Sequence, residues 1–161
     1  VEDAAKRLRY NSLATVMLGI DAPKVNELSW LYFPGKEIFH RVNFPSNYSA
    51  FVAPRGKSSL AAEITYGEGD KISKLTDAEL VRRTTAHLHG KIIDEGDVCF
   101  AKVNRVKYGY IIYDRERKRS LQIIKRFLDK TGIRVCGRFA EWSYLNMDAC
   151  IKNAMNLAAE I

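Results

Sequence analysis

Apolar and polar residues alternate over short stretches through most of the chain, and the spacing predicts strands interrupted by helices. Runs with the apolar content of strands lie at Ser12–Gly19, Leu28–Phe33, Ile38–Val42, Leu60–Tyr66 and Val98–Ile112. The turn dipeptide Pro34-Gly35 separates the second run from the third, so we expect these two to form a hairpin. The last run is long enough for one or two strands.

Helical spacing appears in four segments. Glu2–Arg9 predicts a short helix, and Thr76-Asp-Ala-Glu79 has the form of a capping box that opens a helix reaching about His89. A basic helix follows residue 112 and ends at Thr131-Gly132, where glycine is the usual terminator. From Met147 to Ile161 apolar residues recur at intervals of three and four, so one face of this helix is expected to be buried.

These elements predict an α+β fold, with a mostly antiparallel sheet covered on one face by three to four helices. Ile133–Cys136 adds a short buried strand just before the last helix. A doubly wound parallel sheet is disfavoured because strands and helices do not alternate regularly and no glycine-rich first turn is present.

Composition fits a globular domain, since 161 residues with 47% hydrophobic content can build a core. No apolar run approaches the ~20 residues of a membrane span, and we expect no membrane association. Because the chain starts at Val1 and not at methionine, we expect a processed end or a boundary within a longer protein.

The three cysteines, Cys99, Cys136 and Cys150, form no CxxC pair, which favours a reducing, cytoplasmic setting. His87 and His89 would point apart on a helix, so no metal site is predicted.

The formal charge of +7 raises the alternative of a stand-alone basic module that binds nucleic acid or another anionic partner. The densest cluster contains Arg115, Arg117, Lys118, Arg119, Lys125, Arg126 and Lys130. Apolar residues between these charges, Leu121, Ile124, Phe127 and Leu128, are spaced as one helix face. The pattern therefore favours an ordinary solvated helix face over a nucleic-acid site, and no nucleic-acid motif is present.

The junction before the last helix, Gly137–Asp148, concentrates groups that can bind a ligand. Asn146 suits the N-cap position and Asp148 the first helical turn. The free amides of the helix start can bind an anion or a polarised oxygen, and Arg138 can add a positive charge.

A structural interpretation of the same junction stays open. Asn146 can simply cap the helix, and Arg138 can pair with Glu141 or Asp148. Trp142 and Tyr144 can then be core residues.

The sequence Gly137-Arg-Phe-Ala-Glu-Trp-Ser-Tyr-Leu-Asn-Met-Asp148 resembles the C-terminal signature of FAD-dependent enzymes related to UDP-galactopyranose mutase, the flavin amine oxidases and protoporphyrinogen oxidase. Tyr108–Asp114 and the basic helix after it resemble the tyrosine-bearing strand and following helix of that family. Phe39–Asn47 resembles the arginine-bearing strand of its substrate domain. The resemblance covers most of the chain from about Leu28 onward.

The resemblance implies roles for individual residues. FAD would be contacted by Gly137, Arg138, Asn146, Met147 and Asp148. The substrate side would contain Arg41, Tyr110, Trp142 and Tyr144, with Tyr144 beside the flavin and Arg41 supplying a charge. No catalytic residue is assigned, because the sequence holds no Ser-His-Asp, Cys-His or paired-carboxylate constellation that would act without a flavin.

The chain has no Gly-x-Gly-x-x-Gly segment for the AMP end of FAD. The resemblance therefore implies the C-terminal part of a flavin-dependent oxidoreductase of the amine oxidase type. Residues 1–132 would form the substrate-domain-like sheet and helices, and residues 133–161, a strand followed by a helix, would return to a missing N-terminal FAD-binding half. Its small-molecule substrate would be an amine or a sugar nucleotide, and its implied setting is cell-surface polysaccharide or sugar-nucleotide metabolism. A flavin-dependent sugar-nucleotide mutase is the alternative. Alone, the chain is expected to bind FAD weakly and to catalyse nothing, and an uncovered apolar surface could form a homodimer.

Overall fold

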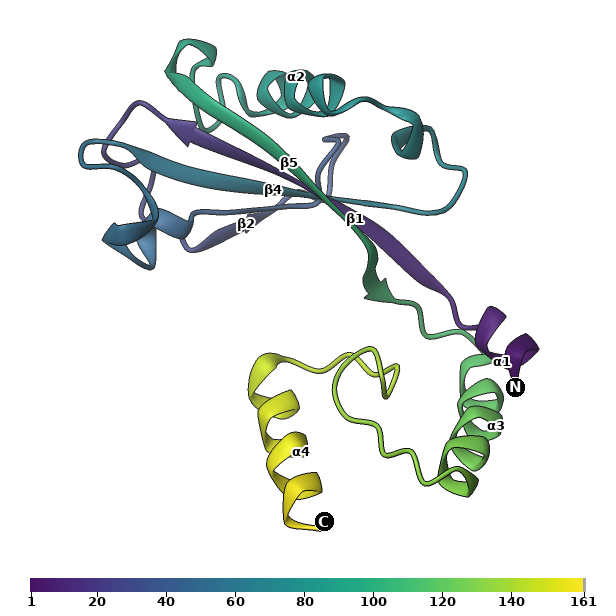
Figure 1. Cartoon of the computed structure of the whole chain (residues 1–161). Coiled ribbons are helices and arrows are strands. Elements are labelled where there is room, and N and C mark those ends of the chain that lie inside the picture. Colours follow the sequence, from purple (N-terminus) through teal and green to yellow (C-terminus); the bar gives the residue numbers. More distant parts are fainter. Residues whose placement is uncertain (161) are drawn as a thin grey trace. The chain divides into compact units, whose positions relative to one another are not determined.

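The structure is a computed structural model that describes residues 1–160 (Figure 1). Its helices and strands are α1 (Glu2–Lys6), β1 (Tyr10–Ile20), β2 (Trp30–Tyr32), β3 (Arg41–Asn43), β4 (Ser58–Tyr66), α2 (Asp77–Leu88), β5 (Val98–Ile111), α3 (Arg117–Lys130) and α4 (Met147–Ala159). Short 3-10 helices include η1 (Pro45–Asn47) and η2 (Ala50–Val52). This content confirms the predicted α+β class.

The chain forms two compact units. The sheet unit is Ser12–Lys107, and the terminal unit combines Val1–Asn11 with the chain from Tyr108 onward. The division into residues 1–132 and 133–161, which follows the resemblance to flavin enzymes, remains a prediction.

The strands form one five-stranded sheet in the order β2-β3-β4-β1-β5. β1 pairs antiparallel with β4, and the predicted hairpin exists as the antiparallel pair β2 and β3. Successive side chains of a strand point to opposite faces, and along β1 the alternate residues Ala14, Val16, Leu18 and Ile20 are buried. These residues define one core-facing side of the sheet.

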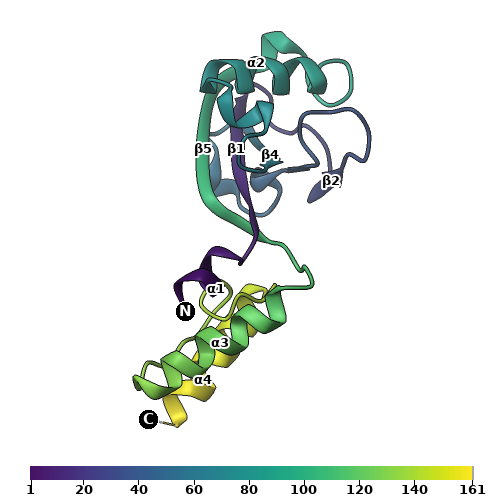
Figure 2. The same ribbon diagram turned by 90° about the vertical axis from the view of Figure 1, so that its right-hand side faces the viewer.

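Helix α2 covers this core-facing side of the sheet (Figure 1, Figure 2). Its Leu80 and Leu88 belong to the same hydrophobic cluster as Val16 of β1. The predicted capping box is confirmed: the Thr76 Oγ1 accepts a hydrogen bond from the Glu79 amide at 3.2 Å, and Glu79 Oε2 accepts one from the Thr76 amide at 2.8 Å. The bond from the Thr76 amide is the main reason that the pKa of Glu79 lies below its ordinary value.

In the terminal unit, α1 packs against α3, and Ala4 and Ser120 are buried. The segment between α3 and α4 contains no strand, so the predicted strand Ile133–Cys136 is wrong. A strand requires hydrogen bonds from a neighbouring strand, and none within residues 1–160 pairs with this segment. Its Ile133 and Val135 side chains are exposed.

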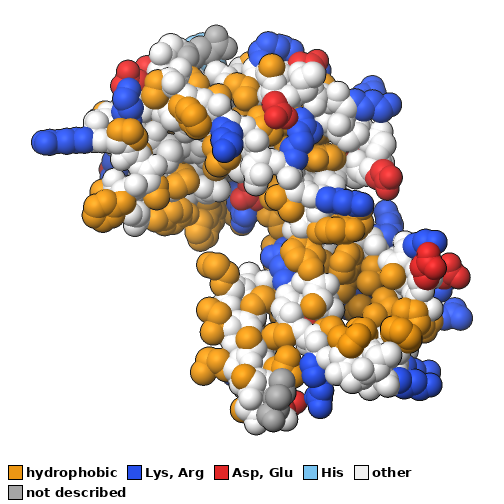
Figure 3. All heavy atoms as spheres, in the orientation of Figure 1, with side chains coloured by type: hydrophobic (Ala, Val, Ile, Leu, Met, Phe, Trp, Pro, Cys, Tyr) orange, Lys and Arg blue, Asp and Glu red, His pale blue; other side chains and the backbone are white. Residues whose placement is uncertain are grey.

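Helix α4 forms where its periodicity predicts, but the expectation that its apolar face is buried is wrong for the described residues. Met147, Ile151 and Met155 are 84%, 61% and 68% exposed. Figure 3 shows hydrophobic side chains along the surface of this helix. Ile161, which the prediction included in the helix, lies outside the described residues. The periodicity correctly predicts an apolar stripe along α4, yet no described part of the chain covers this stripe.

Candidate functional site

The predicted ligand-binding junction is a compact loop of the terminal unit that closes on itself before α4. Gly137 has a φ of +96°, a left-handed conformation that favours glycine. Its amide donates to Glu141 Oε1 at 2.9 Å, and the Glu141 amide donates back to the Gly137 carbonyl at 2.9 Å. Asn153 of α4 also donates to Glu141 Oε1, at 3.1 Å. The Glu141 carboxylate therefore ties the loop to the helix that follows it.

Arg138 lies among aromatic rings within this loop. Its guanidinium carbon is 4.1 Å from the centre of the Tyr144 ring, 5.4 Å from that of Tyr110 and 5.7 Å from that of Phe139. Tyr110 and Tyr144 are stacked, with ring centres 6.1 Å apart and planes 14° apart. The structure thus brings together three of the residues predicted from the sequence, two of them from a loop and one from β5.

The Arg138 guanidinium is only partly satisfied. Its Nε and Nη2 atoms are buried and have no hydrogen-bond partner in residues 1–160. Cation–π contacts stabilise a guanidinium by about 0.5–2 kcal/mol, which does not replace the hydrogen bonds lost on burial. Glu141, one of the two carboxylates expected to pair with Arg138, is instead bonded to Gly137 and Asn153. Two buried donors of Arg138 are therefore left without an acceptor among the described residues.

A second arginine, Arg117 at the start of α3, holds the loop in place. Its guanidinium donates to the Trp142 carbonyl from both Nε and Nη2, and Nη2 also donates to Ser143 Oγ at 3.0 Å. The same guanidinium stacks on Tyr113 at 4.1 Å, and the Tyr113 hydroxyl accepts a hydrogen bond from the Tyr144 amide at 2.7 Å. Tyr113 and Arg117 together fix the backbone that presents Tyr144.

Neither Tyr113 nor Arg117 was identified from the sequence as part of the site. Arg117 was counted among the solvated charges of the basic helix, but it is half-buried and hydrogen-bonded, so that assignment is corrected. The other cluster members, such as Lys118, Arg119 and Arg126, are exposed as expected. Asp114 is the sequence signal that could have located the start of α3 and, with it, Arg117. Its Oδ1 accepts a hydrogen bond from the Arg117 amide at 2.9 Å.

Trp142 has a backbone conformation that is unusual for its residue type. Its φ of +48° is the left-handed region, which is unfavourable for a bulky side chain. Its ring lies 6.3 Å, centre to centre, from each of Tyr10, Tyr108 and Phe139. The side chain predicted to face a substrate is therefore packed within an aromatic cluster, and its Nε1 is buried with no hydrogen-bond partner among the described residues.

The start of α4 lacks the cap that the sequence predicts. Asn146 has the extended backbone of an N-cap residue, but its side chain makes no capping hydrogen bond. Asp148 lies in the first turn as expected, and Met147 is exposed. The first amides of α4 are therefore not satisfied by Asn146, and such amides together with the helix dipole favour an anion or a polarised oxygen.

Arg41, the remaining predicted substrate-side residue, lies on β3 of the sheet unit, directly opposite Glu63 of β4. Its Nη2 is 2.6 Å and its Nε 3.0 Å from Glu63 Oε1, and its guanidinium lies 5.9 Å from the centre of the Tyr32 ring. Glu63 is buried, and His40 Nε2 is 3.9 Å from its second oxygen. Glu63 thus neutralises much of the Arg41 charge.

His40 is the titratable neighbour of this pair. Burial lowers its pKa below the ordinary value, and the nearby Glu63 opposes this shift only in part. The imidazole is consequently biased toward its neutral form. Arg41 and Arg138 belong to different units.

Among residues 1–160, no group of three or more His, Cys, Asp or Glu side chains is arranged to hold a metal ion. His87 Nδ1 instead accepts a hydrogen bond from the Ile38 amide at 2.8 Å.

Within residues 1–160, every helix is too short or too polar to cross a membrane. The three cysteines are free thiols.

The fold of this chain is similar to that of known solved structures. No protein-family model and no curated protein matches the sequence. The structure is similar to the crystal structure of reduced UDP-galactopyranose mutase, with a TM-score of 0.77 and 25% identity, covering 88% of this chain and 31% of the other. It is also similar to a protein from Exiguobacterium sp. 255-15 provisionally assigned as a protoporphyrinogen oxidase, with a TM-score of 0.72 and 15% identity, covering 96% and 35%.

These two enzymes are among those that the sequence resembles, so the resemblance is confirmed as a shared fold. At 15% identity, the second similarity carries information on the fold alone. This chain spans about a third of the length of either protein.

Proposed function

We propose that this chain forms the substrate-side sheet and the flavin-contacting segment of an FAD-dependent oxidoreductase of the amine oxidase type. The observation that carries the proposal is the Arg138 guanidinium, held by Tyr110 and Tyr144 with two buried donors and no protein acceptor among the described residues. It lies in the segment whose sequence resembles the family's flavin-contacting signature. A cofactor rich in phosphate and carbonyl oxygens would satisfy these donors.

The residues present fit such a cofactor. Arg138 offers charge-assisted hydrogen bonds, and the start of α4, from Asn146 to Asp148, offers amides that Asn146 does not cap. Gly137 leaves the backbone open for close approach, since nothing lies within 4 Å of where its Cβ would be. The flavin, when bound, supplies acceptance of a hydride from the substrate, and the protein supplies binding and orientation.

The exposed stripe of α4 supports the same proposal. Met147, Ile151 and Met155 form an uncovered apolar face, and such faces mark surfaces that another protein part covers. The two similar enzymes are about three times as long as the matched region. The cofactor is therefore proposed to lie between this segment and an FAD-binding part that belongs to the same enzyme.

The proposal is tested by titrating FAD into the protein and following flavin fluorescence, with Arg138→Met as the variant. The isolated chain should bind weakly, and the variant should bind about tenfold or more weakly, because a charged hydrogen bond contributes about 1.5–3 kcal/mol. Arg119→Met, which removes an exposed arginine of α3, is the matched control and should bind like the parent.

Two results would contradict the proposal. Equal weakening in both variants would show only non-specific attraction to positive charge. Tight binding or turnover by the isolated chain would disprove the requirement for a second FAD-binding part.

A flavin-dependent sugar-nucleotide mutase is the second candidate, favoured by the higher identity and TM-score of the match to UDP-galactopyranose mutase. It predicts that UDP-galactose binds in the presence of reduced FAD and that Tyr144→Phe weakens this binding. An oxidase that acts on an amine predicts no such binding.

A further inference from the structure

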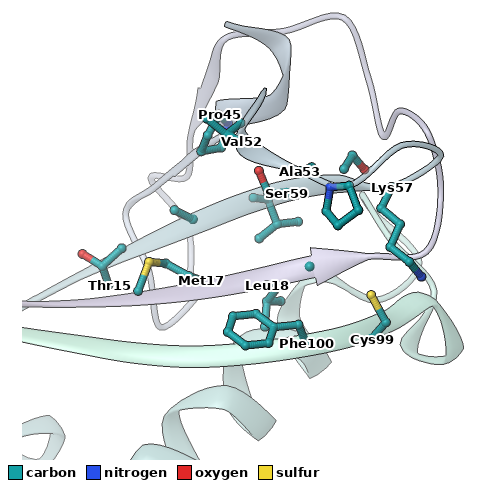
Figure 4. Close-up of a pocket in the computed structure, with 15 residues that line it drawn as sticks. Thr15, Met17, Leu18, Pro45, Val52, Ala53, Lys57, Ser59, Cys99 and Phe100 are labelled. Carbon is teal, nitrogen blue, oxygen red and sulfur yellow. The ribbon is translucent and has the colours of Figure 1, made fainter. Parts of the chain in front are cut away.

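The sheet unit contains a cavity of about 510 Å³ on the sheet face opposite α2. Met17 of β1 pairs with Ala61 of β4, and both alternate with the core residues Val16 and Ala62, so they form the floor of the cavity. In Figure 4, Pro45 and Val52, from the η1–η2 region, lie on one side of this floor, and Phe100 of β5 lies on the other.

The lining of the cavity is mostly apolar and includes Met17, Pro45, Val52, Pro54, Ala61 and Phe100. Lys57 is the charged side chain among its lining residues in the described part of the chain, and its ammonium lies 2.7 Å from Asp21 Oδ1. The hydrogen bond to Asp21 raises the pKa of Lys57, so the ammonium stays charged but is already neutralised. The cavity therefore offers apolar contact and no free charge to a ligand.

We propose that this cavity binds an uncharged, largely apolar small molecule. Its volume lies within the roughly 300–1,000 Å³ of drug-sized ligand sites, and such sites are lined mainly by apolar side chains. A sugar nucleotide does not fit this chemistry, because its pyrophosphate needs unpaired cations such as arginine. The proposal goes beyond flavin binding and depends on the sheet unit only.

Two lining positions allow the cavity to be changed. Ala61 is on the floor, so Ala61→Phe fills the space that a ligand would use. Val52 is half exposed at the rim, so Val52→Asp places a carboxylate against the ligand without entering the core. Val106 of β5 is also exposed but does not line the cavity, so Val106→Asp is the matched control.

The experiment titrates the neutral fluorophore 1-aminoanthracene into the protein and its variants, with folding checked by circular dichroism. We expect saturable binding at one site, weakened about tenfold or more in Val52→Asp, because an apolar ligand would have to desolvate the carboxylate. Ala61→Phe should abolish binding, and Val106→Asp should leave it unchanged. Should Ala61→Phe not fold, the Val52→Asp and Val106→Asp pair still decides the question.

Thiol alkylation locates the bound probe. Cys99 lines the cavity, whereas Cys136 and Cys150 belong to the terminal unit. Bound 1-aminoanthracene should slow the reaction of Cys99 with N-ethylmaleimide, followed peptide by peptide in the mass spectrometer, and leave the other two rates unchanged.

Three results would overturn the proposal: equal loss of binding in Val52→Asp and Val106→Asp, no protection of Cys99, or displacement of the probe by UDP-galactose. The flavin titration with Arg138→Met has a separate readout in the other unit. The two proposals can therefore fail independently.

Discussion

The sheet unit and the terminal unit are stabilised in different ways. Every member of the main hydrophobic cluster, from Ala14 to Ile93, belongs to the sheet unit. In the described part of the terminal unit, the buried side chains are Ala4, Ile111 and Ser120. Its loop is held by individual polar bonds, such as that from Arg117 to the Trp142 carbonyl. A unit with its own core can fold by itself, whereas a unit with an uncovered apolar helix depends on what binds to it.

The largest expected effect tests this difference directly. Phe44→Ala removes a side chain that is 1% exposed within the sheet core, and should lower the free energy of unfolding by about 3–5 kcal/mol. Ile151→Ala removes an exposed side chain from α4 and should change it by less than about 0.5 kcal/mol. Urea unfolding monitored by circular dichroism measures both. A similar cost for the two variants would mean that α4 is buried in solution, for example in a homodimer.

Helix capping gives a smaller contrast between the units. Thr76→Ala breaks the capping box of α2 and should cost about 1 kcal/mol of unfolding free energy. Asn146→Ala should cost only a few tenths of that amount, since the Asn146 side chain makes no capping bond at α4. Thermal unfolding of both variants beside the parent provides the comparison. A larger loss for Asn146→Ala would show that α4 is capped after all.

The smallest expected effect is a dependence of stability on pH that originates in the sheet unit, where His40, His87 and His89 all lie. The pKa of His40 is lowered in the folded state, so the unfolded chain takes up a proton at higher pH. Stability due to His40 is therefore complete above its ordinary pKa of 6.5 and is lost as the pH falls below it.

Melting temperatures measured between about pH 7.5 and about pH 5.5 should fall less steeply for His40→Gln than for the parent. An unchanged slope in His40→Gln would contradict the burial of His40 beside Glu63.

Local signals in the sequence predicted most of the sheet unit. The alternation along β1 and the Thr76–Glu79 box each involve neighbours within a few residues, and both appear in the structure. Pro34-Gly35 lies within the irregular segment that joins β2 to β3, and the two strands pair as predicted. Such features are set by short-range geometry, which a sequence displays directly.

The predictions that were wrong all concern the terminal unit and depend on partners distant in the chain or outside it. Ile133–Cys136 has strand-like residues but no neighbouring strand among those described. The α4 stripe has the right period but nothing to cover it. Contacts of Arg117 with Trp142, and of Tyr113 with Tyr144, join residues 25 and 31 positions apart, and no periodicity reveals them.

The roles proposed for the junction residues remain predictions. The sequence identified Arg138, Tyr110 and Tyr144 as functional through their resemblance to a family signature. The structure adds that they contact one another and that two nitrogen atoms of Arg138 lack an acceptor among the described residues. Sequence patterns cannot show an unsatisfied donor, because satisfaction depends on atomic positions.

The strand order has a consequence for how the chain acquires its structure. β1 lies between β4 and β5, although both follow it in the chain, and Ser12 pairs with a residue as distant as Tyr66. During synthesis, β1 therefore has no partner strand until β4 emerges, and its core side chains Val16, Leu18 and Ile20 are not yet packed. Pairing over such separations is slow, and an apolar strand that stays unpaired is prone to aggregation. We expect refolding yields to fall with protein concentration and to recover when a chaperone shields β1.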